Sequence, residues 1–267
     1  MDSSSARPVA DDDLGLAERL VQNRLSGEVA TPVGSCVGNC RRLVAGHAEY
    51  TFGLSDWRVA SFENAIAALE AAGGGRLRGH ADETPAFIEP AATLAGVRKH
   101  RDVLAELVAG GGGKVLVATG HPVLLPHYGT LAGALARAGC LLLRPLGDGR
   151  EVARTPEGIP CSIAYIDDVA ALFHGGSTRH THLPEYMEAM LDSVGNGLPE
   201  LVVADHGFAG AAIEAGIAAL SIADVNDPAL PLAQARGRTD GVLLIDDGLR
   251  NDLFAPVTDA ILAWDSR

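Results

Sequence analysis

The amino-acid sequence predicts an α/β protein with three layers, in which a mostly parallel, Rossmann-like sheet follows a mostly helical N-terminal segment. Short apolar runs recur in the second half of the chain, and each precedes a polar turn and small residues at helical spacing. Hydrophobic residues make up 47% of the chain and aromatic residues only 4%. A core of Ala, Leu and Val is therefore expected, which suits helices packed closely on a parallel sheet.

The clearest strand–turn–helix unit lies in residues 114–139, KVLVATGHPVLLPHYGTLAGALARAG. The run Val115–Ala118 predicts a buried strand, the next four residues a tight turn, and the Ala/Leu-rich remainder a helix. Open α/β sheets bind ligands at the carboxyl ends of their strands, and the first NH groups of a helix attract anions. The turn lacks the spaced glycines of a dinucleotide loop and the Gly-Lys-Ser/Thr of a P-loop.

Composition divides the chain into three segments. Residues 1–13 are polar and acidic, so we expect a disordered tail. Residues 14–110 are expected to be mostly helical, and residues 111–267 to form the α/β core, in one domain with the preceding helices. The passage 26–39 is rich in turn-forming residues. The helices expected before the core are Leu14–Asn23, with Leu16, Leu20 and Val21 on one face; a helix near Trp57, capped by Ser55 or Asp56; and Pro90–Ala109.

The core segment continues with strands and helices in alternation. Asp167-Asp168 separates the apolar runs Ile163–Ile166 and Val169–Phe173, which predicts a hairpin, although Asp-Asp is a weaker turn signal than Asp-Gly. The other expected elements are strands at Leu141–Leu143, Leu201–Ala204, Leu220–Ala223 and Val242–Ile245, and helices at Pro184–Leu191, after Gly207, and at Ala255–Trp264.

Charge and cysteine content exclude several classes of function. The net charge of −13 argues against a nucleic-acid or anionic-membrane partner, because no basic stripe is present. No apolar run reaches the ~20 residues that cross a bilayer, and the first residues contain no apolar signal-peptide core, so a cytoplasmic protein is expected. The four cysteines, Cys36, Cys40, Cys140 and Cys161, form neither a CxxC pair nor a convincing disulfide framework, and we interpret them as buried thiols.

Polar side chains follow several predicted strands at the point where each strand ends. His121 follows the first strand of the core, and Asp205 and His206 follow the strand at 201–204. Asp224, with Asn226 and Asp227, follows the strand at 220–223, and Asp246 and Asp247 follow the strand at 242–245. If the strands are parallel, these side chains lie along one edge of the sheet, where a site can form. Polar turns also follow strands where nothing binds, because loops must be solvated.

Each candidate residue has a functional and a structural interpretation. His121 titrates near neutral pH and suits acid–base catalysis, yet a turn histidine is also common. Asp205 could orient His206 or cap a helix, and Asp224 with Asp227 could hold a hard cation or form an ordinary Asn-Asp-Pro turn. The functional interpretation assigns catalysis to His121, His206 and Asp205; substrate binding to Thr119, Gly120, Gly207, Arg179, His180 and His182; and metal binding to Asp224 and Asp227.

Several known catalytic motifs are absent from the sequence. It contains no GxSxG elbow, no Cys-x5-Arg loop and no HExxH helix, so serine acyl chemistry and zinc proteolysis are poorly supported.

Three blocks, ATGHP, RHTHLPEYM and ADHGFAGAA, resemble blocks of a bacterial family named phosphatase that is common in high-GC actinobacteria. That family carries ATGHP, HTHSPEPM and ADHGWAGAA, and the resemblance extends from about Leu20 onward. Leu183, Tyr186 and Phe208 depart from the pattern, and Leu183 removes a hydroxyl that the family carries. The resemblance implies a phosphatase and selects Gly120, His121, His180, His182, Glu185, Asp205, His206, Gly207, Asp224 and Asp227.

The leading hypothesis is hydrolysis of a small phosphomonoester, with Mg²⁺ or Mn²⁺ as a candidate cofactor. His121 or His206 would protonate the leaving oxygen, and Asp205 with Asp224 or Asp227 would hold the cation or direct water. The alternative is a non-catalytic sensor that binds a phosphorylated metabolite or nucleotide in the same cleft. An interaction protein that uses the helical segment is a third possibility that no single feature favours.

The phosphatase hypothesis predicts a geometry. His121, Asp205, His206 and Asp224 should line one cleft, with His180 or His182 reaching it from the preceding loop. The structural interpretation predicts instead that these side chains scatter over different faces of the molecule.

Overall fold

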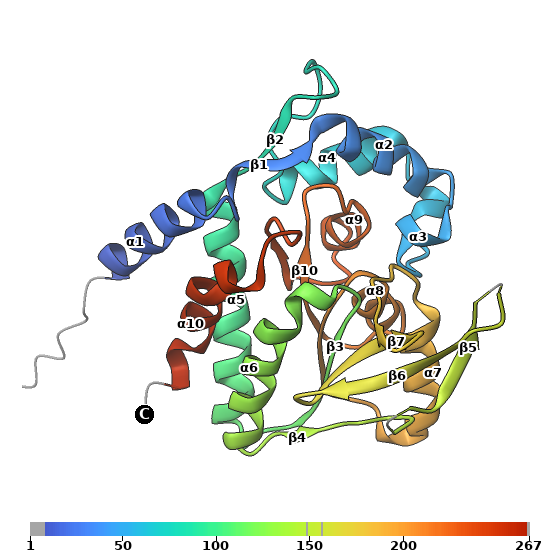
Figure 1. Ribbon diagram of the computed structural model, residues 1–267. Helices are drawn as coiled ribbons and strands as arrows, with labels where there is room; N and C mark the ends of the chain where they lie inside the picture. Colours follow the sequence, from blue (N-terminus) through green and yellow to red (C-terminus); the bar gives the residue numbers. More distant parts are fainter. Residues whose placement is uncertain (1–8, 148, 156, 266–267) are drawn as a thin grey trace, which may run out of the picture.

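The central element of the protein is a mixed sheet whose middle strands are all parallel (Figure 1). The computed structural model describes residues 9–147, 149–155 and 157–265. Within these residues the strand order is β11-β10-β9-β3-β7-β6-β5, with β4 also beside β3 and β8 beside β7. The parallel strands are β3 (Lys114–Thr119), β4 (Leu141–Leu142), β7 (Val169–His174), β9 (Leu201–Asp205), β10 (Ala219–Ala223) and β11 (Val242–Leu244).

The antiparallel part of the sheet is the hairpin that the sequence predicts. β6 (Pro160–Ile166) pairs antiparallel with β7, and Asp167 and Asp168 form the turn with φ of 48° and 64°. Aspartate tolerates the left-handed region better than most residues, which explains how Asp-Asp replaces Asp-Gly here. The edge strand β5 (Glu151–Arg154) and the short β8 (Ser177–Thr178) complete this antiparallel part.

Helices cover both faces of the sheet and give three layers. Successive strand residues point to opposite faces, so Leu116 and Val202 belong to one buried cluster while Val115 and Val203 belong to another. The α/β class and the mostly parallel sheet are confirmed, and the Rossmann-like assignment stays a prediction. The first cluster packs under α2 (Val33–Val44), α4 (Phe62–Ala71), α7 (Glu185–Val194), α8 (His206–Glu214) and α9 (Ala229–Ala235); the second packs under α1 (Val9–Gln22), α5 (Pro90–Ala109), α6 (Leu125–Arg137) and α10 (Ala255–Ile261).

The N-terminal segment differs from the prediction in several places. The passage expected to be turn-rich forms β1 (Gly27–Pro32) and then α2, and β1 pairs antiparallel with β2 (Pro85–Ile88). Residues 56–59 form only a 3₁₀ turn, and the helix that follows is capped by Ser61, whose side chain accepts from the Asn64 NH. Val21 lies outside the apolar face of α1, since it is 46% exposed.

Three smaller predictions concern the ends of the chain and the cysteines. Residues 9–13 of the predicted disordered tail lie in α1, and residues 1–8 lie outside the described part. The terminal helix ends at Ile261 and continues as a 3₁₀ turn over Leu262–Asp265. All four cysteines are free and buried, as expected. No helix among the described residues is long and apolar enough to span a bilayer.

Candidate functional site

The candidate site lies at the carboxyl ends of four adjacent parallel strands, β3, β9, β10 and β11. The turn after each strand contributes polar side chains, and the segment 179–183, which follows β8, crosses the same edge. The short helix α3 (Ala48–Thr51) and the residue after it also reach this edge. Residues from distant parts of the chain therefore meet at one place.

Asp205, the last residue of β9, is a fully buried hub. Its Oδ1 accepts from the Gly120 NH at 2.7 Å and faces His206 Nδ1 at 2.8 Å, while its Oδ2 accepts from the Thr119 hydroxyl at 2.5 Å. Burial alone would raise the pKa of this carboxyl, but the bonds from His206, Thr119 and Gly120 hold it below its usual value. Asp205 is thus occupied within the protein and ties the turn after β3 to His206.

His206 begins α8 in a strained conformation that turns its ring into the site. Its φ of 46° lies in the left-handed region, which is uncommon for residues other than glycine and is often found at functional sites. Asp205 accepts from Nδ1–H, and Nε2 on the other side of the ring lies 3.5 Å from Asp227 Oδ2 and 3.7 Å from Asp247 Oδ2, two carboxylates that favour a proton on Nε2. Burial would lower the pKa of His206, but Asp227, Asp205 and Asp247 raise it to about 10.

His180 and His182 meet the ring of His206 from the crossing segment. The carbonyl of Glu49 accepts from His182 Nδ1 at 3.0 Å, which leaves His182 Nε2 facing His180 Nε2 at 3.0 Å. The His182 ring stacks on the His206 ring with centroids 4.5 Å apart. Backbone and carboxylate acceptors on Nδ1 thus direct the Nε2 atoms toward one another.

His121 completes the group of four histidine rings. Its ring centroid lies 4.3 Å from that of His180 and 5.7 Å from that of His206. Thr119 holds the turn, since its hydroxyl oxygen accepts from the His121 NH at 3.0 Å. Burial lowers the pKa of His121, and its Nδ1 is buried with no hydrogen-bond partner among the described residues.

Four buried aspartates, Asp224, Asp227, Asp246 and Asp247, follow β10 and β11, and Asp227 and Asp247 face His206. Burial and neighbouring carboxylates raise the pKa of Asp224 well above its usual value, and burial raises the pKa of Asp247 to about 8 and also raises that of Asp246. One imidazole faces more carboxylates than it can neutralise. The electrostatics of this edge therefore favour an additional positive charge.

The donor atoms form two groups that could hold a metal ion. His180, His182 and His206 form one group, His206, Asp227 and Asp247 form the other, and the ligand atoms of each group lie within 4.8 Å of one another. Asp247 Oδ2 is buried without a hydrogen-bond partner among the described residues. Asp224 belongs to neither group, since its oxygens accept from the Val225 NH at 2.7 Å and the Thr31 hydroxyl at 3.0 Å.

The glycines expected to face a ligand face the crossing segment instead. A Cβ on Gly120 would lie 2.3 Å from the Thr181 carbonyl oxygen, and one on Gly207 would lie 2.4 Å from the His182 carbonyl oxygen. The Thr181 NH also donates to the Gly120 carbonyl at 2.9 Å. These glycines let the histidine-bearing segment approach β3 and α8 closely.

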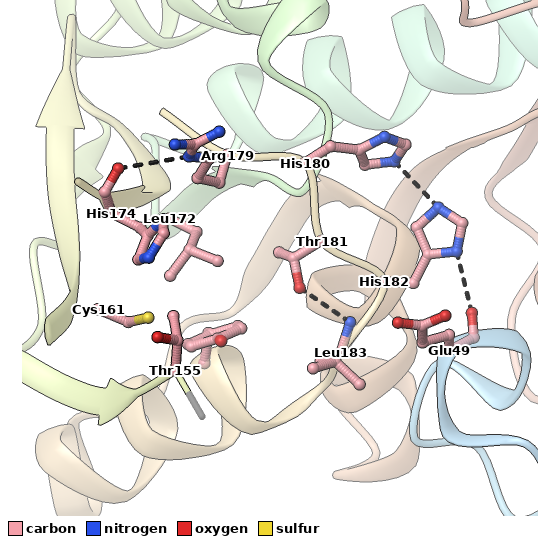
Figure 2. A pocket seen from close by; sticks show the side chains of 11 residues that line it. Glu49, Thr155, Cys161, Leu172, His174, Arg179, His180, Thr181, His182 and Leu183 are labelled. Carbon is pink, nitrogen blue, oxygen red and sulfur yellow. Dashed lines mark hydrogen bonds between the residues drawn. The ribbon is translucent and has the colours of Figure 1, made fainter. Parts of the chain in front are cut away.

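The structure therefore brings together most of the residues that the sequence singles out. His121, His180, His182, Asp205, His206 and Asp227 converge, and Asp224 lies beside them, whereas the exposed Arg179 lines a neighbouring cavity. Figure 2 shows this cavity, with Arg179 bonded to the carbonyl of His174.

Three contributors to the site have no role in the assignment made from sequence. Asp247, three residues after the end of β11, is among the polar groups that follow predicted strands, but no catalytic, binding or metal role was assigned to it. The ring of Phe52, 1% exposed, packs against His182 and His206 with centroids 5.3 Å and 5.4 Å away. The carbonyl of Glu49 lies on a four-residue helix that no pattern in the sequence predicts.

Comparisons with known proteins agree on one family. A family model described as Phosphatase matches residues 11–266. A protein of Streptomyces coelicolor that is named a phosphatase is 36% identical to the chain over 243 residues, which cover 87% of each protein.

Proposed function

Because the chain belongs to the Phosphatase family, we propose that it hydrolyses small phosphomonoesters at the carboxyl edge of its sheet with the help of a divalent cation. The observation that carries this proposal is the convergence of three histidines and two aspartates, with ligand atoms within 4.8 Å in each group. A phosphoryl group is anionic, and a site rich in carboxylates would repel it without a cation between them. The same donor atoms that repel the substrate are those that bind a metal.

The donor set favours a transition metal over Mg²⁺. Imidazole nitrogens suit Fe²⁺ or Zn²⁺, carboxylates also suit Mn²⁺, and Mg²⁺ prefers an all-oxygen shell. His206, Asp227 and Asp247 would hold the ion, with His180 and His182 completing the shell. A cation bound there would polarise the phosphoryl oxygens and lower the pKa of bound water. Of the two cofactors expected from sequence, Mn²⁺ fits these ligands better than Mg²⁺.

The chain's own residues divide the remaining tasks. In the reaction a water oxygen bonds to phosphorus, the ester P–O bond breaks, and the leaving oxygen takes a proton. His121 is best suited to move a proton, because its Nδ1 is free of partners among the described residues, whereas Asp205 holds His206 Nδ1. Asp205 acts as a positioning residue, since its three internal bonds keep it from the substrate.

Removal and replacement of the metal tests the proposal. The purified protein would be stripped with a chelator and assayed for phosphate release from a panel of phosphomonoesters, with Mg²⁺, Mn²⁺, Fe²⁺ or Zn²⁺ added singly. We expect activity that a transition metal restores and Mg²⁺ restores poorly. Phosphate release at the background rate with every metal would overturn the proposal, and recovery of an intact, tightly bound ester would favour the sensor.

Two neighbouring aspartates supply a matched pair of variants. Asp247→Asn removes a donor of the second group and should lower kcat/KM by at least about 100-fold. Asp246→Asn changes a carboxylate that accepts from the Gly248 NH at 3.1 Å and lies outside both groups, so its kcat/KM should stay within about threefold. Equal losses in the two variants would indicate a general effect of charge rather than ligation.

A further inference from the structure

A cavity of about 650 Å³ lies beside the histidine cluster (Figure 2). The segment 179–183 forms one wall of this cavity, and His180 and His182 line it as well as belonging to a metal-binding group. In Figure 2 the side chains of Thr181 and Leu183 project toward the cavity, while the two histidine rings stand at its edge. The cavity and the candidate metal site thus share a boundary.

The chemistry of the cavity lining is apolar at the bottom and polar at the rim. Cys161 from β6, Leu172 from β7 and Tyr186 from α7 contribute buried side chains, exposed by 4%, 5% and 6%. Polar side chains line the more exposed part: Thr155 and His174 are half-buried, and Arg179 and Glu49 are exposed. A cavity of a few hundred Å³ with mostly apolar walls and a few polar groups is typical of small-molecule sites.

We infer that this cavity receives the organic group of the substrate and selects phosphomonoesters with a planar, apolar group such as an aryl ring. The inference rests on the proposed function, because it places the phosphoryl group at the edge where His180 and His182 stand. The side chains of Cys161, Leu172 and Leu183 offer little hydrogen bonding to a polar group buried against them, whereas Thr155 and His174 stand at more exposed positions on the lining. A flat apolar group gains by burial against the same walls.

A pair of substrates that differ in ring size tests the inference. Phenyl phosphate and 2-naphthyl phosphate have leaving groups of similar acidity, so a difference in kcat/KM reports binding of the second ring. We expect the natural protein to prefer the naphthyl ester by about tenfold. Cys161→Phe fills the cavity and should remove this preference, so that kcat/KM for the naphthyl ester falls at least to the value for phenyl phosphate.

A second cavity variant and a control variant distinguish the effect of filling the cavity from the effect of misfolding. Thr155→Trp obstructs the cavity from a half-buried position on its lining and should act like Cys161→Phe. Ala67→Phe makes a similar change in another hollow, between α4 and α9, and should leave the preference intact. Equal turnover of both esters by the natural protein, or a preference that survives both cavity variants, would overturn the inference and leave the phosphatase proposal in place.

Binding of a stable analogue separates the two proposals. Calorimetry with 2-naphthylmethylphosphonate and benzylphosphonate measures the affinity of the cavity for the two ring systems, because neither analogue can be hydrolysed. Tighter binding of the naphthyl analogue that Cys161→Phe abolishes would support the cavity assignment even if neither ester were hydrolysed. Equal affinity for the two analogues in the natural protein would refute it, whatever the protein does to phosphate esters.

Discussion

At the scale of single residues, the group that accepts a hydrogen bond from Nδ1 of a histidine determines which ring nitrogen can face a ligand. Asp205 accepts a hydrogen bond from His206 Nδ1, and the Glu49 carbonyl accepts one from His182 Nδ1. Both rings therefore direct Nε2 toward the site. The lowered pKa of His182 leaves its Nε2 lone pair available, whereas a metal at His206 would have to displace the Nε2 proton that the raised pKa of about 10 retains. Partners of this kind commonly contribute 10–100-fold to metal affinity although they never touch the metal.

A substitution of Asp205 tests this role. Asp205→Asn should weaken metal binding about 10- to 100-fold. The amide has only one oxygen to accept hydrogen bonds from the Thr119 hydroxyl, the Gly120 NH and His206 Nδ1. Competition with a coloured chelator measures the affinity, and a thermal melt confirms that the variant folds. Asp224→Asn is the control, since Asp224 bonds Val225 and Thr31 and lies outside both donor groups. If the Asp224 variant lost more affinity than the Asp205 variant, the ligand assignment would be wrong.

At the scale of elements, the segment 179–183 is held against the sheet by backbone contacts. Gly120 in the turn after β3 and Gly207 in α8 leave no room for a Cβ beside it. The NH of Thr181 donates to the Gly120 carbonyl at 2.9 Å. The positions of His180 and His182 therefore depend on glycines that do not themselves carry any chemistry.

Gly120→Ala should displace this segment. The added Cβ would lie 2.3 Å from the Thr181 carbonyl oxygen, so the backbone must move, at a cost of about 1–3 kcal/mol of stability. We expect at least a tenfold loss of metal affinity and of kcat/KM. Gly197→Ala is a matched control, because a Cβ there meets nothing within 4 Å. Unchanged metal affinity in the Gly120 variant would show that the segment is not positioned by this contact.

The elements that carry the site differ in how well the sequence predicts them. β3, β9, β10 and β11 are buried on both faces and read as short continuous apolar runs, so their ends, and with them His121, Asp205 and Asp224, could be located. The ends of β1 and α2 could not be located in this way. The sequence of β1, GEVATP, is short and partly exposed, and the α2 stretch VGSCVGNC contains two glycines and no leucine. The contacts of Phe52 and Glu49 with the histidines join residues more than a hundred positions apart, which no local pattern records.

At the scale of the whole molecule, two buried histidines lie away from the site and make stability depend on pH. His100 Nε2 lies 2.9 Å from the Gly241 carbonyl, and His127 Nδ1 lies 2.7 Å from the Thr258 hydroxyl. Burial lowers the pKa of His100 to about 4 and that of His127 to about 3, from an ordinary value of 6.5. Both rings are neutral in the folded protein, and the unfolded chain binds more protons below pH 6.5.

The contribution of these two histidines to stability should therefore be complete above pH 6.5 and fall as the pH drops from 6.5 toward 4. Each histidine should contribute a loss of about 2 kcal/mol between pH 7 and pH 5, because one pKa unit corresponds to about 1.4 kcal/mol. Urea unfolding at the two pH values measures the sum. His127→Gln should remove about half of the difference, since glutamine does not titrate.

Asp247, beside His206, acts in the opposite direction, and its contribution must be separated from that of the two histidines. The raised pKa of Asp247, about 8, means that its carboxyl gains protons more readily when folded, so its contribution to stability grows as the pH falls. Asp247→Asn removes that contribution and should make the acid-induced loss steeper. Direct titration of the imidazole resonances by NMR identifies the source: a His127 or His100 ring that titrates near pH 6.5 in the folded protein would contradict the prediction, whatever the slope of the unfolding curve.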